Sequence, residues 1–363
     1  MEVKRRILVD LLSYTGNKGG TDVYIRKLYG SIGKLNHNYS FFALASREAK
    51  ELDMSWFPGE IKFSEISGDN KFSWSIGEVF SVNRFAKKIE PDFIHCPANF
   101  GPLKSKYKIV LTLHDALYWS KPHLAPNRIL LLGVRFMQKF VSKISVEVIT
   151  DSISSSAEIE EYLEIPRNRI SPIYLGTEFN GMVRSSSEVG ESYFLAGGNR
   201  FRHKNWENLL AAWSIISPQQ RPNLIITGGG PKDPLTFLVE KYSLASHVKL
   251  LSWVSEEELE KLYAEATAIV IPSLSEGFSL GVMQALSARK PLLASNIPVH
   301  IELADRIAYF FDPSSPSSIA SAVNEFSQEH VGLETRLSMG VERSLSFSWK
   351  NCALETLAVF DRV

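Results

Sequence analysis

The sequence predicts an α/β protein made of two doubly wound units, each a parallel sheet flanked by helices. Three observations support this fold class. The chain has 363 residues, more than a single hydrophobic core usually serves. Short β-branched runs alternate with helical patterns in both halves. A segment rich in Ser and Gly, with few apolar residues, separates the halves at 180–191 and is the expected linker.

Each strand is predicted from a short apolar run that ends at turn residues. The first unit, 1–179, has such runs at 7–12, 93–95, 109–113 and 146–150. The second unit, 192–346, has them at 193–196, 224–227, 248–250, 269–271 and 292–295. The serine cluster at 152–156 offers hydroxyl groups that cap the start of a helix. The last segment, 347–363, has the amphipathic pattern of a terminal helix.

Composition excludes several classes of protein. The formal net charge is zero and 22% of the residues are charged, so no basic field for nucleic acid is present. The two cysteines, Cys96 and Cys352, are too few for a disulfide framework, which fits a reducing, cytoplasmic setting. The basic and apolar N-terminus favours a first strand over a signal peptide, and no run approaches the roughly 18 apolar residues of a spanning helix.

The most informative segment is the loop at 273–281, between the strand at 269–271 and a helix predicted at 282–288. Ligands of parallel sheets bind beyond the carboxyl ends of the strands, where this loop lies. Its glycines allow a close approach of the backbone, and the free amides of a helix start favour anionic oxygens. Glu276 fits a cradle for a phosphorylated sugar; the alternative is an acid that only offsets a helix dipole.

Two loops of the first unit lie at the same edge of their predicted sheet. Gly19 and Gly20 follow the first strand and open a helix, although many doubly wound folds have such a loop only to turn the chain. The loop lacks both the Walker lysine pattern and the three-glycine dinucleotide spacing. His114 directly follows the strand at 109–113, which places it where ligands bind, yet a lone histidine is more often structural.

The second unit has a cationic loop at 196–205, where Arg200, Arg202 and Lys204 follow paired glycines. Cations and backbone dipoles stabilise the charge that develops on a leaving nucleoside diphosphate. The alternative is a solvated basic turn. Trp253, after the strand at 248–250, fits either a residue flanking a nucleobase or a core tryptophan.

Together these motifs resemble glycosyltransferase family 4, retaining enzymes of the GT-B fold. The resemblance includes the glycine loop, T-L-H-D at 112–115, H-K-N at 203–205, the 273–284 loop, F-D-P at 311–313 and S-W-K at 348–350, all in the family's order. It implies two Rossmann-like domains facing a cleft, with the terminal helix returning to the first domain. The sequence departs from the family's pattern at Gln284, where a second glutamate is usual, and at Gly281, where a proline is usual.

The resemblance also implies roles for single residues. It makes Glu276 the residue that holds donor-sugar hydroxyls and His114 a positioning or transition-state residue beside that sugar. Lys204, with Arg200 or Arg202, would bind the diphosphate, and Gln284 would face the ribose with one acceptor and no charge. The remaining donor-binding residues would be Gly19, Gly20, Trp253, Val254, Gly277, Phe278, Ser279 and Leu280.

The expected function is retaining transfer of a hexose from a nucleoside-diphosphate sugar to a glycan or lipid-linked acceptor. Mannose from GDP-mannose is the first guess, because 295–302 resembles mannosyltransferase and rhamnosyltransferase members. No Asp-x-Asp pair and no His or Cys cluster occurs in the chain, which favours transfer without a metal or another cofactor. The alternatives are a nucleotide-sugar epimerase or hydrolase of the same fold, and a catalytically weak sugar-nucleotide-binding subunit.

One amphipathic segment, 127–145, carries apolar residues on one face and Arg128, Arg135, Lys139 and Lys143 on the other. Two interpretations fit it. The helix lies peripherally on an anionic membrane surface, at the inner face of the membrane near a lipid-linked acceptor. Alternatively, and more commonly, the apolar face packs on the core of its own domain.

Overall fold

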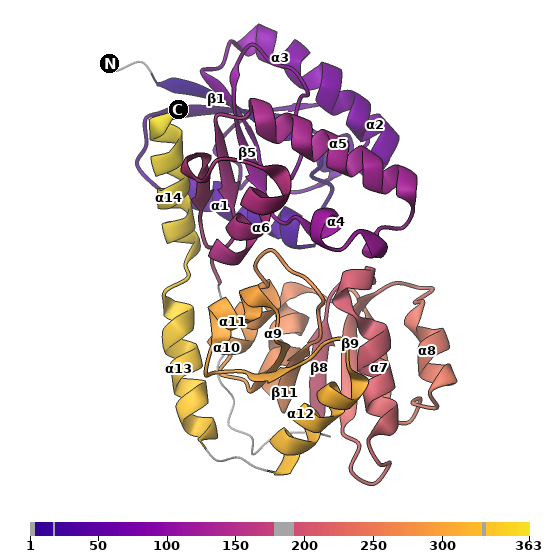
Figure 1. The fold of residues 1–363 in the computed structure, drawn as a ribbon. Coiled ribbons are helices and arrows are strands. Elements are labelled where there is room, and N and C mark those ends of the chain that lie inside the picture. Colours follow the sequence, from indigo (N-terminus) through magenta and orange to yellow (C-terminus); the bar gives the residue numbers. More distant parts are fainter. Residues whose placement is uncertain (1–3, 17–18, 178–191, 329–331) are drawn as a thin grey trace. The chain divides into compact units, whose positions relative to one another are not determined.

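A computed structural model describes residues 4–16, 19–177, 192–328 and 332–363. The chain divides into two compact units, each with its own parallel sheet (Figure 1). The N-terminal unit comprises Met1–Gly176 and Ser348–Val363, and the C-terminal unit comprises Thr177–Phe347. The linker predicted at 180–191 lies outside the described residues. The predicted fold class, two doubly wound α/β units, is confirmed.

The N-terminal unit has seven strands in the order β3-β2-β1-β4-β5-β6-β7, and every pair is parallel. Its strands are β1 (Arg5–Leu11), β2 (Tyr39–Ala45), β3 (Gly59–Phe63), β4 (Phe93–Cys96), β5 (Lys108–Leu113), β6 (Glu147–Thr150) and β7 (Ile170–Pro172). Its helices are α1 (Gly20–Ile32), α2 (Lys71–Ile76), α3 (Val82–Ile89), α4 (Leu117–Ser120), α5 (Arg128–Ile144), α6 (Ile153–Leu163) and α14 (Trp349–Arg362). The chain order reverses between β1 and β4, which makes their carboxyl ends the switch point where ligands bind.

Local sequence signals fix two helix starts of this unit. Ser152 accepts a hydrogen bond from the Ser155 amide at 2.9 Å, and the Ser155 hydroxyl faces the Ser152 amide, so the predicted serine cluster forms a capping box for α6. Ser348 caps α14 through the Asn351 amide at 3.1 Å. Helix α14 packs beside α1 and buries Phe360 against Phe93 and His95. The terminal helix is therefore part of the N-terminal unit's core.

The C-terminal unit has six parallel strands in the order β10-β9-β8-β11-β12-β13. The strands are β8 (Tyr193–Gly197), β9 (Asn223–Gly229), β10 (Val248–Ser252), β11 (Ala268–Ile271), β12 (Leu292–Ser295) and β13 (Tyr309–Phe311). The helices are α7 (Trp206–Ile215), α8 (Leu235–Lys241), α9 (Glu256–Glu265), α10 (Leu280–Ser287), α11 (Pro298–Ala304), α12 (Pro316–Gln328) and α13 (Leu333–Leu345). Here the switch point lies between β8 and β11.

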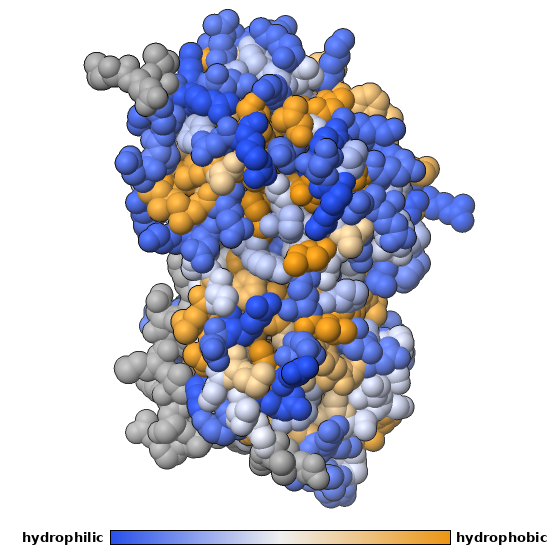
Figure 2. Space-filling view, turned by 60° about the vertical axis from the view of Figure 1, so that its left-hand side comes forward, coloured by the Kyte–Doolittle hydropathy of each residue, from blue (hydrophilic) through white to orange (hydrophobic). Residues whose placement is uncertain are grey.

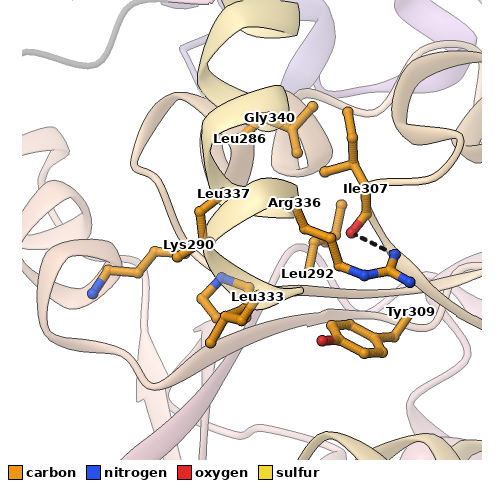
Figure 3. A pocket seen from close by; sticks show the side chains of 10 residues that line it. Leu286, Lys290, Leu292, Ile307, Tyr309, Leu333, Arg336, Leu337 and Gly340 are labelled. Atoms are coloured by element: carbon orange, nitrogen blue, oxygen red, sulfur yellow. Dashed lines mark hydrogen bonds between the residues drawn. The ribbon is translucent and has the colours of Figure 1, made fainter. Parts of the chain in front are cut away.

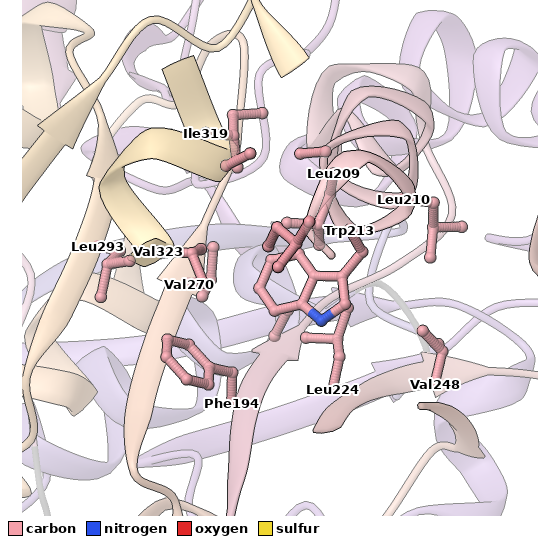
Figure 4. Close-up of a cluster of buried hydrophobic side chains, with 14 of the residues drawn as sticks. Phe194, Leu209, Leu210, Trp213, Leu224, Val248, Val270, Leu293, Ile319 and Val323 are labelled. Carbon is pink, nitrogen blue, oxygen red and sulfur yellow. The ribbon is translucent and has the colours of Figure 1, made fainter. Parts of the chain in front are cut away.

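Trp213 of α7 is at the centre of this unit's core (Figure 4). Its ring meets Phe194 of β8 edge to face, with centroids 5.8 Å apart, and its indole N–H donates to the Pro222 carbonyl at 3.0 Å. Leu224 and Val270 of the neighbouring strands complete the cluster around it. This packing holds α7 against the sheet and so fixes the loop that precedes α7.

Helix α13 covers one end of the same sheet and leaves little space beneath it. Arg336 donates to the Ile307 carbonyl at 3.3 Å, and its guanidinium lies 4.7 Å from the Tyr309 ring centre (Figure 3). The hollow under this helix has a volume of about 10 Å³, room for about one water molecule. A wider, shallow hollow of about 480 Å³ lies between α11 and α13. Glu276 and Lys204 line neither of these two hollows.

Helix α5 contacts the core of its unit through Val141, as the core-facing interpretation expects, but it also exposes a row of large apolar side chains. Only Gln138, Val141 and Ser142 of this helix are buried. Figure 2 shows hydrophilic side chains over most of the displayed face, with hydrophobic groups scattered between them. Within the described part of the chain, no helix has the length and apolar character needed to cross a bilayer.

Candidate active site

Three segments of the C-terminal unit meet at the carboxyl edge of its sheet. The 198–205 loop follows β8, the 272–279 loop follows β11, and Pro313 follows β13. Asn205 connects all three: its side-chain amide donates to the carbonyls of Pro272 at 2.9 Å and Pro313 at 2.7 Å. The Leu274 amide donates to the His203 carbonyl at 2.7 Å. The motifs found separately in the sequence therefore form one rigid cluster at the switch point.

Lys204 and Glu276 form an ion pair inside this cluster. The lysine Nζ lies 2.6 Å from Oε1 of Glu276, and the Ser273 hydroxyl donates to the same oxygen at 2.6 Å. The side chains of Lys204 and Glu276 are 20% and 13% exposed. Glu276 therefore has two side-chain partners, Lys204 and Ser273, and does more than offset a helix dipole.

The environment keeps Glu276 ionised. Burial alone would raise its pKa, but the charges of Lys204 and His203 and the two hydrogen bonds outweigh burial and lower the pKa to about 2. An ionised carboxylate is an acceptor only, and it makes strong bonds to hydroxyl groups. The site therefore offers a permanent anionic acceptor next to a cation.

The backbone after Glu276 is strained where α10 begins. Ser279 has a φ of 96°, a region that residues with a side chain rarely adopt. Phe278 is buried against Phe347, with ring centroids 5.9 Å apart, so its side chain anchors the loop. Gly277 and Leu280 are partly exposed at this turn. The loop thus presents backbone groups and Glu276, while the side chain of Phe278 holds the loop in place.

Glycines are required at the ends of β8 and β9. Gly198 and Gly228 both have positive φ, 139° and 86°, and a Cβ on Gly228 would come within 2.4 Å of the Gly198 carbonyl oxygen. Only glycine permits this close approach of two backbones. Gly198, the second glycine of the pair before the cationic loop, therefore serves the packing of the two strand ends.

The structure separates the roles of Arg200 and Arg202. The Arg200 guanidinium binds the Asp233 carboxylate at 2.7 to 3.1 Å and donates to the carbonyls of Gly198 and Thr227 at 2.9 and 2.8 Å. These bonds use its donors, and its side chain is only 11% exposed. Arg202 is exposed, two residues before Lys204. Arg202 is thus the arginine of this loop that is accessible to a diphosphate.

Substitution of the two arginines should give opposite results. Arg200→Ala leaves Asp233 buried without its partner and should reduce the free energy of unfolding by about 3 kcal/mol. Arg202→Ala should change stability by less than about 0.5 kcal/mol but weaken binding of a nucleoside diphosphate about tenfold. Urea unfolding and calorimetric titration measure the two effects. If a folded Arg200→Ala protein lost as much affinity for the nucleoside diphosphate as Arg202→Ala, this assignment of Arg200 to stability and Arg202 to binding would be wrong.

The remaining predicted donor residues surround the same edge. Trp253 is 58% exposed in the turn between β10 and α9, which excludes the core alternative for this tryptophan, and Val254 next to it is partly exposed. Gln284 lies in the second turn of α10 and is also partly exposed. Gly281 approaches β11 closely, since a Cβ there would lie 3.2 Å from Ile271.

In the N-terminal unit, His114 follows β5 at the carboxyl edge of the sheet and is buried. Its Nδ1 lies 2.8 Å from Oδ2 of Asp151, its Nε2 lies 3.0 Å from the Pro97 carbonyl oxygen, and its amide donates to Asn99 at 2.7 Å. Both ring nitrogens face acceptors, an arrangement that favours a proton on each. Burial opposes a charge on the ring, but Asp151 outweighs burial and raises the pKa of His114. These contacts hold His114 in one orientation.

The glycine loop of this unit is only partly described. Gly19 has a φ of 60° and precedes the first residue of α1, Gly20. A positive φ at this position favours glycine. Residues 17–18 lie outside the described part of the chain.

Several residues of these clusters were missed by sequence reasoning. Ser273 and His300 lie near Glu276; His300 is fully buried, burial lowers its pKa to about 4, and its Nε2 has no hydrogen-bond partner among the described residues. Asp151 and Asp233 are the partners of His114 and Arg200. Asp151 directly follows β6, so the rule that selected His114 selects it as well. Among the described residues, no three His, Cys, Asp or Glu side chains are grouped to hold a metal ion.

The fold and the loops at this edge of the sheet are those of a glycosyltransferase family, as comparison with known proteins shows. A model of the family "Glycosyltransferase Family 4" matches residues 18–180, and a model of "Glycosyl transferases group 1" matches residues 182–341. The two matches are consecutive and together span most of the chain. The protein belongs to these glycosyltransferases, as its motif order predicted.

Individual relatives are distant. The O-antigen chain mannosyltransferase B of Escherichia coli is 27% identical over 287 residues, which is 74% of either chain. Sucrose-phosphate synthase from Thermosynechococcus elongatus has the same fold, with a TM-score of 0.81, 16% identity and coverage of 99% of both chains. HepE of Anabaena, solved with UDP and glucose, has a TM-score of 0.76 and 16% identity and covers 99% of this chain and 100% of its own. These two structures are similar in fold alone.

Proposed function

We propose that the protein is a hexosyltransferase that binds a nucleoside-diphosphate sugar at the carboxyl edge of the C-terminal sheet and transfers the sugar with retention of its anomeric configuration. The observation that carries the proposal is the Lys204–Glu276 pair at the switch point between β8 and β11. The pair sets a cation beside a permanent acceptor. A sugar diphosphate needs both, the cation for phosphate and the acceptor for sugar hydroxyls.

Each residue has a distinct part in this proposal. Lys204 and Arg202 bind the diphosphate and stabilise the negative charge that develops as it leaves. Glu276 accepts hydrogen bonds from sugar hydroxyls and holds the anomeric carbon in position. The backbone from Gly277 to Leu280 donates to diphosphate oxygens, and Trp253 with Val254 borders the base. His114, Gly19 and Gly20 are the residues of the N-terminal unit in this proposal, with His114 as a positioning or transition-state residue beside the donor sugar.

The proposed sugar is mannose, carried by GDP. The E. coli relative is named a mannosyltransferase of the O-antigen chain, and a mannosyltransferase of Salmonella typhimurium O-antigen is 28% identical over 60% of the chain. The acceptor in this proposal is a glycan or lipid-linked saccharide at the cytoplasmic side of a membrane, reached through a peripheral contact. The cations of the 198–205 loop take the electrostatic role of a metal ion, and no other cofactor takes part.

The proposal is tested first by ligand-induced thermal stabilisation with GDP, UDP and dTDP, then with the sugars of the stabilising base. We expect GDP and GDP-mannose to raise the melting temperature, because a ligand that binds only the folded state stabilises it. Incubation with GDP-mannose, a mannosylated acceptor and a chelator should yield an α-linked product by NMR. Turnover of the donor without acceptor would indicate an epimerase or hydrolase, and stabilisation without turnover would indicate a binding subunit.

Gln284 gives a further prediction at the same site. If its side chain faces the ribose, Gln284→Glu adds a charged acceptor for the two ribose hydroxyls and should tighten binding of the nucleoside diphosphate about tenfold. Calorimetric titration measures the dissociation constant. Gln220→Glu, on an exposed turn of the same unit, adds the same charge and serves as the control. It should leave the dissociation constant unchanged. An unaltered constant in Gln284→Glu would remove this residue from the site.

A further inference from the structure

Helix α5 exposes a continuous apolar face. Five large side chains, 38% to 85% exposed, recur along it at spacings of three and four residues, which places them on one side of the helix. We call this set the α5 stripe: Ile129, Leu132, Phe136, Phe140 and Ile144. The rings of Phe136 and Phe140 lie together, with centroids 5.7 Å apart. Isolated exposed apolar residues are ordinary, but a continuous row on one helix marks an interaction surface.

The opposite face of α5 fixes the helix to the N-terminal unit. Asn127 caps its start by accepting from the Leu130 amide at 2.8 Å. Gln138 accepts from the Trp119 indole at 3.0 Å, and Arg135 donates to the Tyr118 and Trp119 carbonyls at 2.9 and 3.3 Å. Val141 on the same face is fully buried in the unit's core, so turning the stripe inward would break these bonds and remove Val141 from the core. The stripe is therefore presented outward by a helix that is already formed.

The charges beside the stripe have one sign. Helix α5 contains Arg128, Arg135, Lys139 and Lys143 and no acidic residue. Arg128 and Lys143 are exposed at its two ends. Lys139 binds Glu164 of the segment after α6 at 2.6 Å, and Glu164 itself is 76% exposed. A surface that meets α5 must therefore accept both apolar groups and positive charge.

We propose that the α5 stripe is a docking surface for an anionic lipid bilayer. In this arrangement the helix lies in the plane of the interface, the stripe enters the boundary between headgroups and acyl chains, and Arg128 and Lys143 contact lipid phosphates. A second copy of this chain fits less well, because pairing two α5 helices across a two-fold axis would bring eight cations together without an acidic partner on either helix. The proposal goes beyond the transfer reaction and does not depend on it.

The test uses the full-length protein and vesicles without donor or acceptor. Co-sedimentation with phosphatidylcholine vesicles that contain phosphatidylglycerol should retain the wild type, and pure phosphatidylcholine should retain it less. Phe136→Ser/Phe140→Ser should reduce partition into the anionic vesicles at least tenfold. Lys143→Gln should reduce it about fivefold, because one cation near an anionic surface contributes about that factor. Phe237→Ser is the matched control, since Phe237 is 68% exposed on α8 of the other unit.

A second measurement reports insertion directly. Both native cysteines, Cys96 and Cys352, are buried, so an environment-sensitive fluorophore can be attached selectively to Phe136→Cys or to Phe237→Cys. Anionic vesicles should shift the emission of the label at 136 to the blue and leave the label at 237 unchanged. A wild type that ignores anionic vesicles, or a double variant that binds them equally well, would overturn the proposal. A concentration-dependent dimer that the same double variant abolishes would also overturn it, in favour of a second copy. Because no sugar nucleotide is present, none of these outcomes bears on the proposed reaction.

Discussion

Glu276→Gln should lower kcat/KM for sugar transfer about 10²- to 10³-fold, the loss expected when a preorganised group that stabilises the transition state is removed. The side chain keeps its size, but the amide loses the charge and one acceptor. Lys204 donates to Oε1 of Glu276 at 2.6 Å, so an amide nitrogen at that position would oppose the lysine with a second donor. The remaining carbonyl oxygen would be left to bind Lys204 and Ser273, and the sugar hydroxyls would lose their acceptor.

The measurement is kcat and KM with saturating acceptor, together with the melting temperature of each protein. Glu257→Gln removes the same charge from an exposed position at the start of α9 and serves as the control. We expect the control to keep the wild-type rate, and we expect the Glu276→Gln protein to remain folded. An unchanged rate in a folded Glu276→Gln protein would exclude Glu276 from the site.

The central strands and the loops after them were predictable from sequence because they satisfy strong local rules. A buried parallel strand is a short apolar run, and its carboxyl end is marked by the residue types that ligands require. Glu276, Lys204 and His114 were selected as candidates in this way, and the resemblance to the family assigned their roles. The predicted strands at 7–12 and 269–271 correspond to β1 and β11, displaced by one or two residues.

Three of the four edge strands were missed for a physical reason. Strand β3 (Gly59–Phe63) is at the edge of its sheet and has no buried residue, and β13 (Tyr309–Phe311) and β7 (Ile170–Pro172) have three residues each. Such strands need few apolar residues, so periodicity does not separate them from turns. Strand β2 (Tyr39–Ala45), by contrast, is an apolar run of seven residues that the pattern contained and the prediction omitted.

Partner choice and helix orientation depend on tertiary structure. Arg200 and Arg202 are equivalent in sequence, and only the placement of Asp233 after β9 assigns Arg200 to the fold. For α5, the period of the apolar residues is the same whichever way the helix faces. Its orientation follows from the burial of Val141 in the core and from the polar bonds of Arg135 and Gln138, whose partners lie 16 to 19 residues away.

Lys204→Met should reduce transfer about 100-fold and lower the free energy of unfolding by about 3 kcal/mol. The methionine fills the space of the lysine stem but leaves the Glu276 carboxylate buried without its cation. In the wild type, the lowered pKa of Glu276, about 2, means that the pair stabilises the fold fully above the ordinary pKa near 4.5 and loses this contribution as pH falls from there toward 2. In Lys204→Met the dominant influence is burial, which raises the pKa of the same carboxyl above its ordinary value.

The contribution of Glu276 to the unfolding free energy should therefore change with pH in opposite directions in the two proteins: acid removes a stabilising contribution from the wild type and a destabilising one from Lys204→Met. As pH falls from 7 toward 4.5, the variant takes up a proton at Glu276 and its deficit in unfolding free energy narrows, while the wild type gains nothing from this group. The double variant Lys204→Met/Glu276→Gln has no charge left to bury. At neutral pH it should be more stable than Lys204→Met. Its difference in unfolding free energy from the wild type should not narrow between pH 7 and pH 4.5, and it should remain as inactive as the single variants. Urea unfolding at several pH values measures all three proteins, and equal deficits at pH 7 and pH 5 in Lys204→Met would show that the lysine does not control the ionisation of Glu276.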